Sequence, residues 1–141
     1  FLPIDKTGET ITAATGFQLV VSYNPGYQRM LKDLKPSTRQ RFVALDFNFP
    51  PAAQEALIIE TEATADHATA MALVSLGRRL RGLRDRGLAE VPSTRLLIAA
   101  AGLVVSGISP RQACYSAIVA PLSDDESLVG AMRDLVDATF V

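Results

Sequence analysis

The chain has 141 residues and a net charge of -1, from 14 Lys and Arg against 15 Asp and Glu, so it lacks the positive field that drives non-specific nucleic-acid binding. Even its apolar residues 96–105 are too short a stretch to cross a bilayer. Cys114 is the only cysteine, which excludes a disulfide or a cysteine zinc cluster within this chain. The first residues do not follow the signal-peptide pattern. We therefore expect neither membrane nor nucleic acid among the partners.

The amino-terminal residues favour a hairpin followed by a strand. Residues 1–4 and 9–13 alternate in polarity around a turn-forming cluster, DKTG, whose glycine can take a positive φ. Residues 17–22, FQLVVS, are a nearly continuous apolar run typical of a buried central strand. Asn24, Pro25 and Gly26 then end that strand.

A second short set of elements follows. Pro36 fits the first position of a short helix ending at Arg41, and residues 42–47, FVALDF, predict another strand. Beyond residue 49 the composition turns rich in Ala and Leu with helical spacing. We therefore expect an α/β plus all-α fold, with a mixed part at 1–49 and a helical part at 50–141.

Five helices are predicted in the helical part, each bounded by capping residues, proline or glycine. Their expected ranges are 52–63, 66–86, 94–106, 110–121 and 123–140. Ser93 is the expected cap of the third helix. Ser123 and Glu126 have the spacing of a capping box that opens the last helix.

Asn24 is a candidate site residue because it stands where a predicted strand meets a turn. Ligands of open α/β sheets bind at such strand ends, and an amide can both donate and accept hydrogen bonds to a water or phosphate. The alternative is that asparagine merely tolerates turn geometry before Pro25.

Three arginines are candidates for phosphate chemistry. Arg39 and Arg41 lie two residues apart, so on a helix they point to different sides, and one of them can reach outward. Both can instead be solvated cations favoured at a helix end. Arg95 falls in the first turn of a helix, where its charge opposes the helix dipole, and a bound anion would offset that cost. Pairing with Glu90 or another carboxylate is the alternative for Arg95.

Other charged residues are interpreted as structural. The arginines between residues 78 and 86 fit solvated cations at a helix end, although a subunit interface remains open for them. His67 is the only histidine and is expected to be exposed near a helix start. We expect Cys114 to be a small core residue and the acids at 124–126 to stabilise a helix start rather than bind metal.

Three segments together carry a family resemblance that covers nearly the whole chain: YNPGYQ (23–28), LKDLKPSTRQRFVALDF (31–47) and VPSTRLL (91–97). They resemble the MoxR branch of AAA+ ATPases, in particular its CbbQ/NorQ group, and most of all the CbbQ members. The resemblance implies that residues 1–49 are the carboxy-terminal remnant of an αβα core and residues 50–141 a helical lid.

The resemblance also implies roles for the candidate residues. The sensor-1 polar residue of the family maps onto Asn24, its arginine finger onto Arg41 with Arg39 as second candidate, and its sensor-2 arginine onto Arg95. The family binds ATP and Mg2+ through Walker A and Walker B motifs, and neither motif occurs in this chain. The chain alone is therefore expected to be inactive, and to be a fragment of an ATPase.

The implied function is ATP hydrolysis between neighbours of a homo-oligomeric ring, expected to be a hexamer, that remodels inhibited Rubisco with a CbbO-type von Willebrand factor A adaptor. The implied location is cytoplasmic, with carboxysome association as a further expectation. A NorQ-like ATPase that matures the metal centre of a nitric oxide reductase is one alternative. A noncatalytic helical interaction module is another, and a small nucleic-acid-binding domain is disfavoured by the neutral charge.

Overall fold

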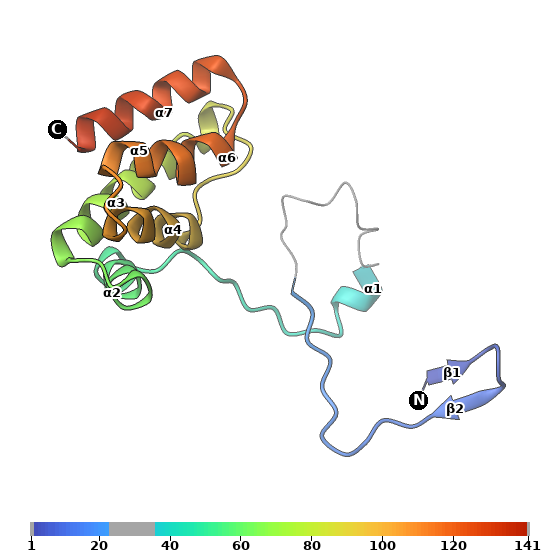
Figure 1. The fold of residues 1–141 in the computed structure, drawn as a ribbon. Coiled ribbons are helices and arrows are strands. Elements are labelled where there is room, and N and C mark those ends of the chain that lie inside the picture. The colour runs from blue at the N-terminus through green and yellow to red at the C-terminus, as the bar shows by residue number, and fades with distance from the viewer. Residues whose placement is uncertain (1, 23–35, 141) are drawn as a thin grey trace. The chain divides into compact units, whose positions relative to one another are not determined.

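The computed structural model describes residues 2–22 and 36–140 (Figure 1). The chain divides into two units, Phe1–Leu45 and Asp46–Val141. The described part of the first unit contains a small sheet and one short helix, and the second unit is helical and contains the hydrophobic core.

The sheet of the first unit is the predicted hairpin. Strand β1, Leu2–Ile4, pairs antiparallel with β2, Glu9–Ile11, in the register that sets Ile4 opposite Glu9. The amide of Gly8 donates to the carbonyl of Ile4 at 2.9 Å, and Gly8 has a φ of +72°. Because only glycine takes such a backbone angle without strain, the hairpin prediction is confirmed together with its turn residue.

The two longer strands predicted in the first part of the chain are wrong for this structure. Residues 17–22 and 42–47 have no regular secondary structure, and Val20 is 86% and Phe47 92% exposed. A central strand needs neighbours on both sides for its N–H and C=O groups, and β1 and β2 are the only paired strands among the described residues. Apolar composition alone therefore does not make these segments strands.

Helix α1, Pro36–Arg39, begins at the predicted proline but ends before Arg41. The amide of Arg41 donates to the carbonyl of Thr38 at 3.1 Å, so Arg41 lies in a tighter turn that follows the helix. Its side chain is exposed.

Helix α2, Ala52–Ala63, has the predicted bounds and starts directly after Pro51. It ends at Thr64, whose φ of +56° makes it the left-handed residue that closes the helix. Helix α3, His67–Arg81, is capped by Asp66, the first residue of the expected range, whose carboxylate accepts from the amide of Thr69 at 2.9 Å.

The expected end of α3 at Arg86 is wrong, because the helix stops at Arg81 and Gly82 follows as its terminal residue. A short 3₁₀ turn, Arg84–Arg86, then leads to Gly87, which has a φ of +100°. This change of direction returns Leu88 to the core, where it is buried. A straight helix to residue 86 would place the next segment away from that core.

Helix α4, Thr94–Val105, is confirmed within one residue, and Gly107 follows it with a φ of +95°. The expected cap is not confirmed. Ser93 occupies the N-cap position with an extended backbone, but its side chain makes no capping hydrogen bond. The start of α4 therefore depends on contacts from elsewhere.

The fourth predicted helix is continuous but changes its winding. Helix α5, Pro110–Cys114, passes through a π-helical turn, Tyr115–Val119, into α6, Ala120–Leu122. Pro121 lies inside the last turn rather than after it. Proline has no N–H and its ring clashes with the carbonyl four residues earlier, so the wider π turn accommodates it.

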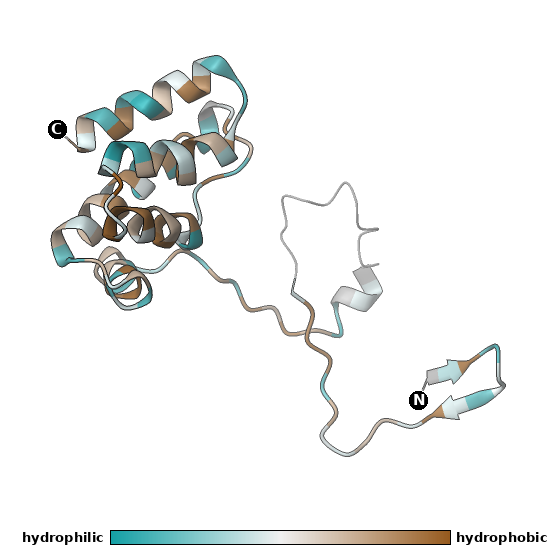
Figure 2. Ribbon diagram, in the orientation of Figure 1, coloured by the Kyte–Doolittle hydropathy of each residue, from teal (hydrophilic) through white to brown (hydrophobic). Residues whose placement is uncertain are grey.

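Helix α7, Glu126–Thr139, does not begin with the predicted capping box. Asp125 caps it instead, with its carboxylate accepting from the amide of Leu128 at 2.9 Å. Ser123 accepts from the amide of Asp125 at 3.1 Å, so it shapes the preceding turn rather than the helix end. Figure 2 shows hydrophilic and hydrophobic bands alternating along α7, as expected of a helix packed on one side.

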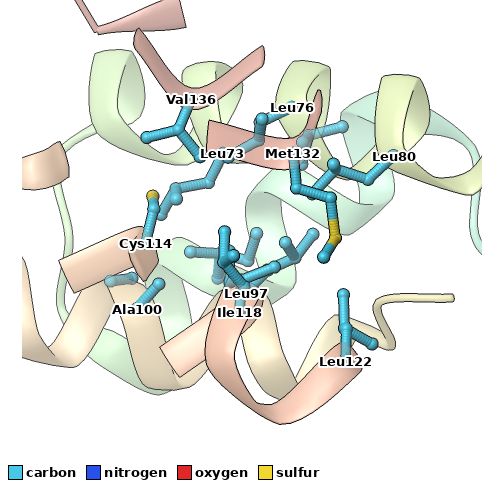
Figure 3. Packing of buried hydrophobic residues seen from close by; sticks show 14 of the residues in the cluster. Leu73, Leu76, Leu80, Leu97, Ala100, Cys114, Ile118, Leu122, Met132 and Val136 are labelled. Atoms are coloured by element: carbon cyan, nitrogen blue, oxygen red, sulfur yellow. The ribbon is translucent and has the colours of Figure 1, made fainter. Parts of the chain in front are cut away.

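The core lies around α3, which packs against α2, α4 and α7. Figure 3 shows apolar side chains of α3, among them Leu73 and Leu76, directed toward those of α4, the α5 to α6 region and α7. Cys114 belongs to this cluster, which confirms its prediction as a core residue, and burial raises the pKa of its thiol to about 12. The thiol is therefore protonated at neutral pH.

Helices α3 and α4 approach closely at Gly77. A Cβ placed on Gly77 would lie 2.9 Å from Cδ1 of Leu97, and Leu97 is itself fully buried. A side chain at position 77 would therefore require Leu97 to shift, although glycine weakens the helix by about 1 kcal/mol relative to alanine.

We predict opposite effects for two glycine-to-alanine changes. Gly77→Ala requires Leu97 to shift, and the overpacking cost of about 1–3 kcal/mol is partly offset by the helix gain of about 1 kcal/mol, so the free energy of unfolding should fall by up to about 2 kcal/mol. Gly102→Ala, in α4 with open space around it, should raise it by about 0.5–1 kcal/mol. Urea unfolding followed by circular dichroism measures both. A stabilising Gly77→Ala would contradict the prediction and show that Leu97 moves aside at little cost.

Candidate functional site

The most buried charge in the helical unit belongs to an ion pair between α2 and α3. Glu55, in the first turn of α2, has no exposed surface, and the side chain of Arg81, the last residue of α3, is 11% exposed. Nη1 of Arg81 donates to Oε2 of Glu55 at 2.8 Å and Nη2 to Oε1 at 2.7 Å. This two-bond geometry fixes the plane of the guanidinium.

The same two side chains reach two further segments. Nε of Arg81 donates to the carbonyl of Pro92 at 2.9 Å, and the hydroxyl of Thr94 donates to Oε1 of Glu55 at 2.7 Å. The guanidinium carbon lies 3.7 Å from the centre of the Phe49 ring. We call these five residues the Arg81 cluster. It joins the segment before α2, the starts of α2 and α4, and the end of α3.

The charge of Glu55 is stabilised by these partners. Burial alone would raise the pKa of Glu55, but the hydrogen bonds from Arg81 and Thr94 and the positive charge of Arg81 outweigh it, and the pKa lies below its ordinary value of 4.5. Among the described residues no buried polar side-chain atom lacks a hydrogen-bond partner, so the cluster is fully satisfied.

The start of α4 carries the predicted site residue Arg95. Arg95 is exposed in the first turn, which contains no acidic residue. Within residues 46–140 no carboxylate forms an ion pair with it, so the pairing considered for Glu90 is absent there. Glu55, bonded to the hydroxyl of the neighbouring Thr94, is the acid that reaches the first residue of this helix.

The remaining predicted site residues belong to the first unit. Arg41 is exposed in the turn after α1. Asn24 and the side chain of Arg39 lie outside the described residues. Their assigned roles, like that of Arg95, therefore stay predictions.

A shallow surface concavity of about 400 Å³ lies beside the Arg81 cluster. Its lining residues are Phe49, Pro50, Pro51, Arg78 and Arg81. Arg78 is exposed and also helps to lower the pKa of Glu55 through its charge. The concavity thus combines an aromatic ring with positive charge beside the segment that precedes α2.

A second set of polar contacts joins the π turn to α7. The hydroxyl of Tyr115 donates to the carboxylate of Asp137 at 2.6 Å, and this bond raises the pKa of Tyr115. The guanidinium carbon of Arg133 lies 5.4 Å from the centre of the tyrosine ring. These contacts serve packing between the two elements.

Neither a metal cluster nor a membrane span is found in the described part of the chain. No group of three or more His, Cys, Asp or Glu there could hold a metal ion, and no helix there is both long and apolar enough to cross a membrane. His67 is exposed near the start of α3, as predicted, with its Nδ1 2.6 Å from Glu60.

The sequence interpretation missed the Arg81 cluster. Interpreting the whole arginine run as solvated cations is wrong for Arg81, which is largely buried. One signal was available: Glu55 falls three residues after Ala52 and four before Ile59, so it stands in the apolar stripe of α2 where a charge needs a partner.

The helical unit, together with the small sheet, is consistent with the carboxy-terminal portion of a AAA+ protein. A family model described as "CbbQ/NirQ/NorQ C-terminal" matches residues 55–139. The chain belongs to this CbbQ/NirQ/NorQ family, which confirms the resemblance seen in its motifs.

Individual relatives match almost all of the chain. It is 53% identical over 137 residues to the "Denitrification regulatory protein NirQ" of Stutzerimonas stutzeri, covering 97% of this chain and 50% of the relative. It is 50% identical to NorQ of Paracoccus denitrificans and 47% identical to CbbQ of Hydrogenophilus thermoluteolus, each over 139 residues and 52% of the relative. The chain therefore spans about half the length of these relatives.

Glu55 should make the stability of the helical unit depend on acid pH. Its pKa is lowered in the folded chain, so the unfolded chain binds more protons, and the stabilisation is complete above the unfolded pKa and lost as pH falls from about 4.5. Glu55→Gln should remove the pH-dependent stabilisation that Glu55 provides. It should also lower the unfolding free energy at neutral pH by about 3 kcal/mol, because Arg81 loses its partner.

Urea unfolding between pH 7 and pH 3 measures this dependence. Glu62→Gln is the matched control, because it makes the same substitution at an exposed glutamate of α2. An unchanged pH profile in Glu55→Gln would contradict the assignment.

Proposed function

We propose that this chain is the carboxy-terminal part of an ATP-driven remodelling motor that works as a homo-oligomeric ring, expected to be a hexamer. The observation that carries the proposal is membership of the CbbQ/NirQ/NorQ family, with identities of 47 to 55% across nearly the whole chain. In this proposal the unit Asp46–Val141 is the lid that follows the nucleotide-binding core.

Each candidate residue has one role in this motor. Asn24 orients the attacking water. Arg41, with Arg39 as second candidate, reaches the γ-phosphate bound by a neighbouring subunit and neutralises developing charge. Arg95 responds to the bound nucleotide at the start of α4 and couples it to movement of the lid.

ATP and Mg2+ would be bound by the part of the longer protein that precedes these residues, as in the family. No residue of this chain is assigned to Mg2+, and the exposed guanidinium groups of Arg41 and Arg95 are suited to anionic oxygens only.

The names of the relatives support two candidate clients. Two relatives named denitrification regulatory proteins share 53% and 55% identity with the chain, whereas CbbQ shares 47%, so a denitrification enzyme such as a nitric oxide reductase is the first candidate. Inhibited Rubisco, remodelled with a CbbO-type von Willebrand factor A adaptor, is the second. The proposed location is cytoplasmic, with carboxysome association in the Rubisco case.

ATP hydrolysis by the complete polypeptide containing this chain tests the motor. Hydrolysis that also raises the activity of a co-expressed nitric oxide reductase supports the first client. ATP-dependent recovery of inhibitor-locked Rubisco, requiring the adaptor, supports the second. A complete polypeptide that binds no nucleotide would support a noncatalytic interaction module instead.

Arg41→Ala in the complete polypeptide should lower kcat by about 10³ or more while ATP binding stays nearly unchanged, because the arginine acts on the charge that develops during transfer. Steady-state hydrolysis and nucleotide titration separate the two effects. Arg84→Ala, at an exposed arginine of the helical unit, is the control. If Arg39→Ala loses activity and Arg41→Ala does not, the finger is Arg39.

Arg95→Ala should weaken ATP binding by about tenfold, the loss of one charge-assisted contact of about 1.5 kcal/mol. Titration with a fluorescent ATP analogue measures this affinity. Parent-like affinity and turnover would show that Arg95 is an ordinary surface charge without a role in ATP binding. This is the result expected for the control, Arg84→Ala.

A further inference from the structure

The Arg81 cluster lies between two places that matter to the proposed motor. One is the segment at residues 49–51, through which the chain enters the helical unit, and the other is the start of α4 with Arg95. We propose that Arg81 and Glu55 are positioning residues that hold the start of α4, and with it Arg95, in a fixed place relative to residues 49–51. This inference rests on the proposed function, because Arg95 is the nucleotide-responsive residue there.

The contacts form a continuous path. The ring of Phe49 lies against the guanidinium at 3.7 Å, and Nε of Arg81 holds the Pro92 carbonyl at 2.9 Å, three residues before Arg95. The Thr94 hydroxyl adds a second connection through Glu55 at 2.7 Å. Because a guanidinium is planar, its three donors fix the directions of Glu55 and Pro92 together.

Apart from the packing of Leu97 in the core, the start of α4 has no capping contact of its own. Ser93 makes no capping bond, and the first turn contains no acid that would stabilise it from within. Glu55 supplies the negative charge from α2 instead, and Arg81 supplies the donor for the carbonyl just before the helix. A shift of either side chain would therefore move the turn that carries Arg95.

Stability alone does not explain this chemistry. A buried ion pair replaced by apolar side chains of similar volume is often as stable or more stable. What an apolar pair cannot provide is a set of directed hydrogen bonds to three segments, because the hydrophobic effect is non-directional. The cluster is suited to transmitting a displacement between residues 49–51 and α4.

The test uses Arg81→Lys and Thr94→Val in the complete polypeptide. Lysine keeps the charge beside Glu55 but cannot hold both carboxylate oxygens and the Pro92 carbonyl in one plane. Thr94→Val keeps the shape and removes only the hydroxyl. The controls are Arg79→Lys, an exposed arginine of the same helix, and Thr61→Val, whose hydroxyl bonds only to Leu57 within its own helix.

Both test variants should raise the KM for ATP, Arg81→Lys by roughly tenfold, within the loss of up to about 10² that a displacement of 1 Å can cause. Their kcat should fall less than the KM rises, and the controls should stay within about twofold of the parent. Thr94→Val keeps the test decisive if Arg81→Lys fails to fold.

A double-mutant cycle with Arg95→Ala distinguishes positioning from general stability. If Arg81 acts through Arg95, Arg81→Lys should have little further effect on the KM once Arg95 is alanine. A full, additive effect in that background overturns the inference, and so does a parent-like KM in both test variants of an active polypeptide. A parent polypeptide that binds no ATP overturns the proposed function itself, and the inference falls with it.

Discussion

The helical unit depends on one buried ion pair whose partners come from different helices. Arg81 and Glu55 join α3 to α2 and, through Pro92 and Thr94, to the start of α4. Removing either partner leaves an uncompensated charge, so the pair is costly to break. Because every bond in it has a direction, it specifies how the three helices meet and not only that they meet. The apolar core supplies the driving force for folding, and this pair adds a directional constraint to the packing of the helices.

Apolar contacts fix most of α3, and the ion pair fixes its carboxy-terminal end. Along α3, Leu73, Leu76 and Leu80 face the core, and Gly77 lets α4 approach to within contact of Leu97. At the end of α3 the chain turns through Gly82, so Arg81 is the last side chain that the helix can direct toward α2. A helix extended to residue 86 would be incompatible with the return of the chain to α4. The early end of α3 is therefore what brings the site residues of the helical unit together.

The elements predicted correctly are those that depend on residues within the element itself. The hairpin followed from a turn with glycine at a positive φ, and α2 followed from Pro51 and the spacing of apolar residues. The strands expected at 17–22 and 42–47 failed because a strand is stabilised by neighbours that pattern cannot supply. The π turn before Pro121 and the cap at Asp125 were not predicted. Several neighbouring residues could have capped α7, and backbone geometry selects among them.

Motifs that are contiguous along the chain identify the family, and local spacing predicts a helical part with Cys114 in its core. The sequence also selected Asn24, Arg39, Arg41 and Arg95 as candidates, from resemblance. The burial of one arginine of a charged run against a glutamate 26 positions away became apparent from the folded chain. Helical spacing puts Arg81 beside the apolar stripe, four residues after Gly77, but its burial depends on how α2 and α4 pack beside it.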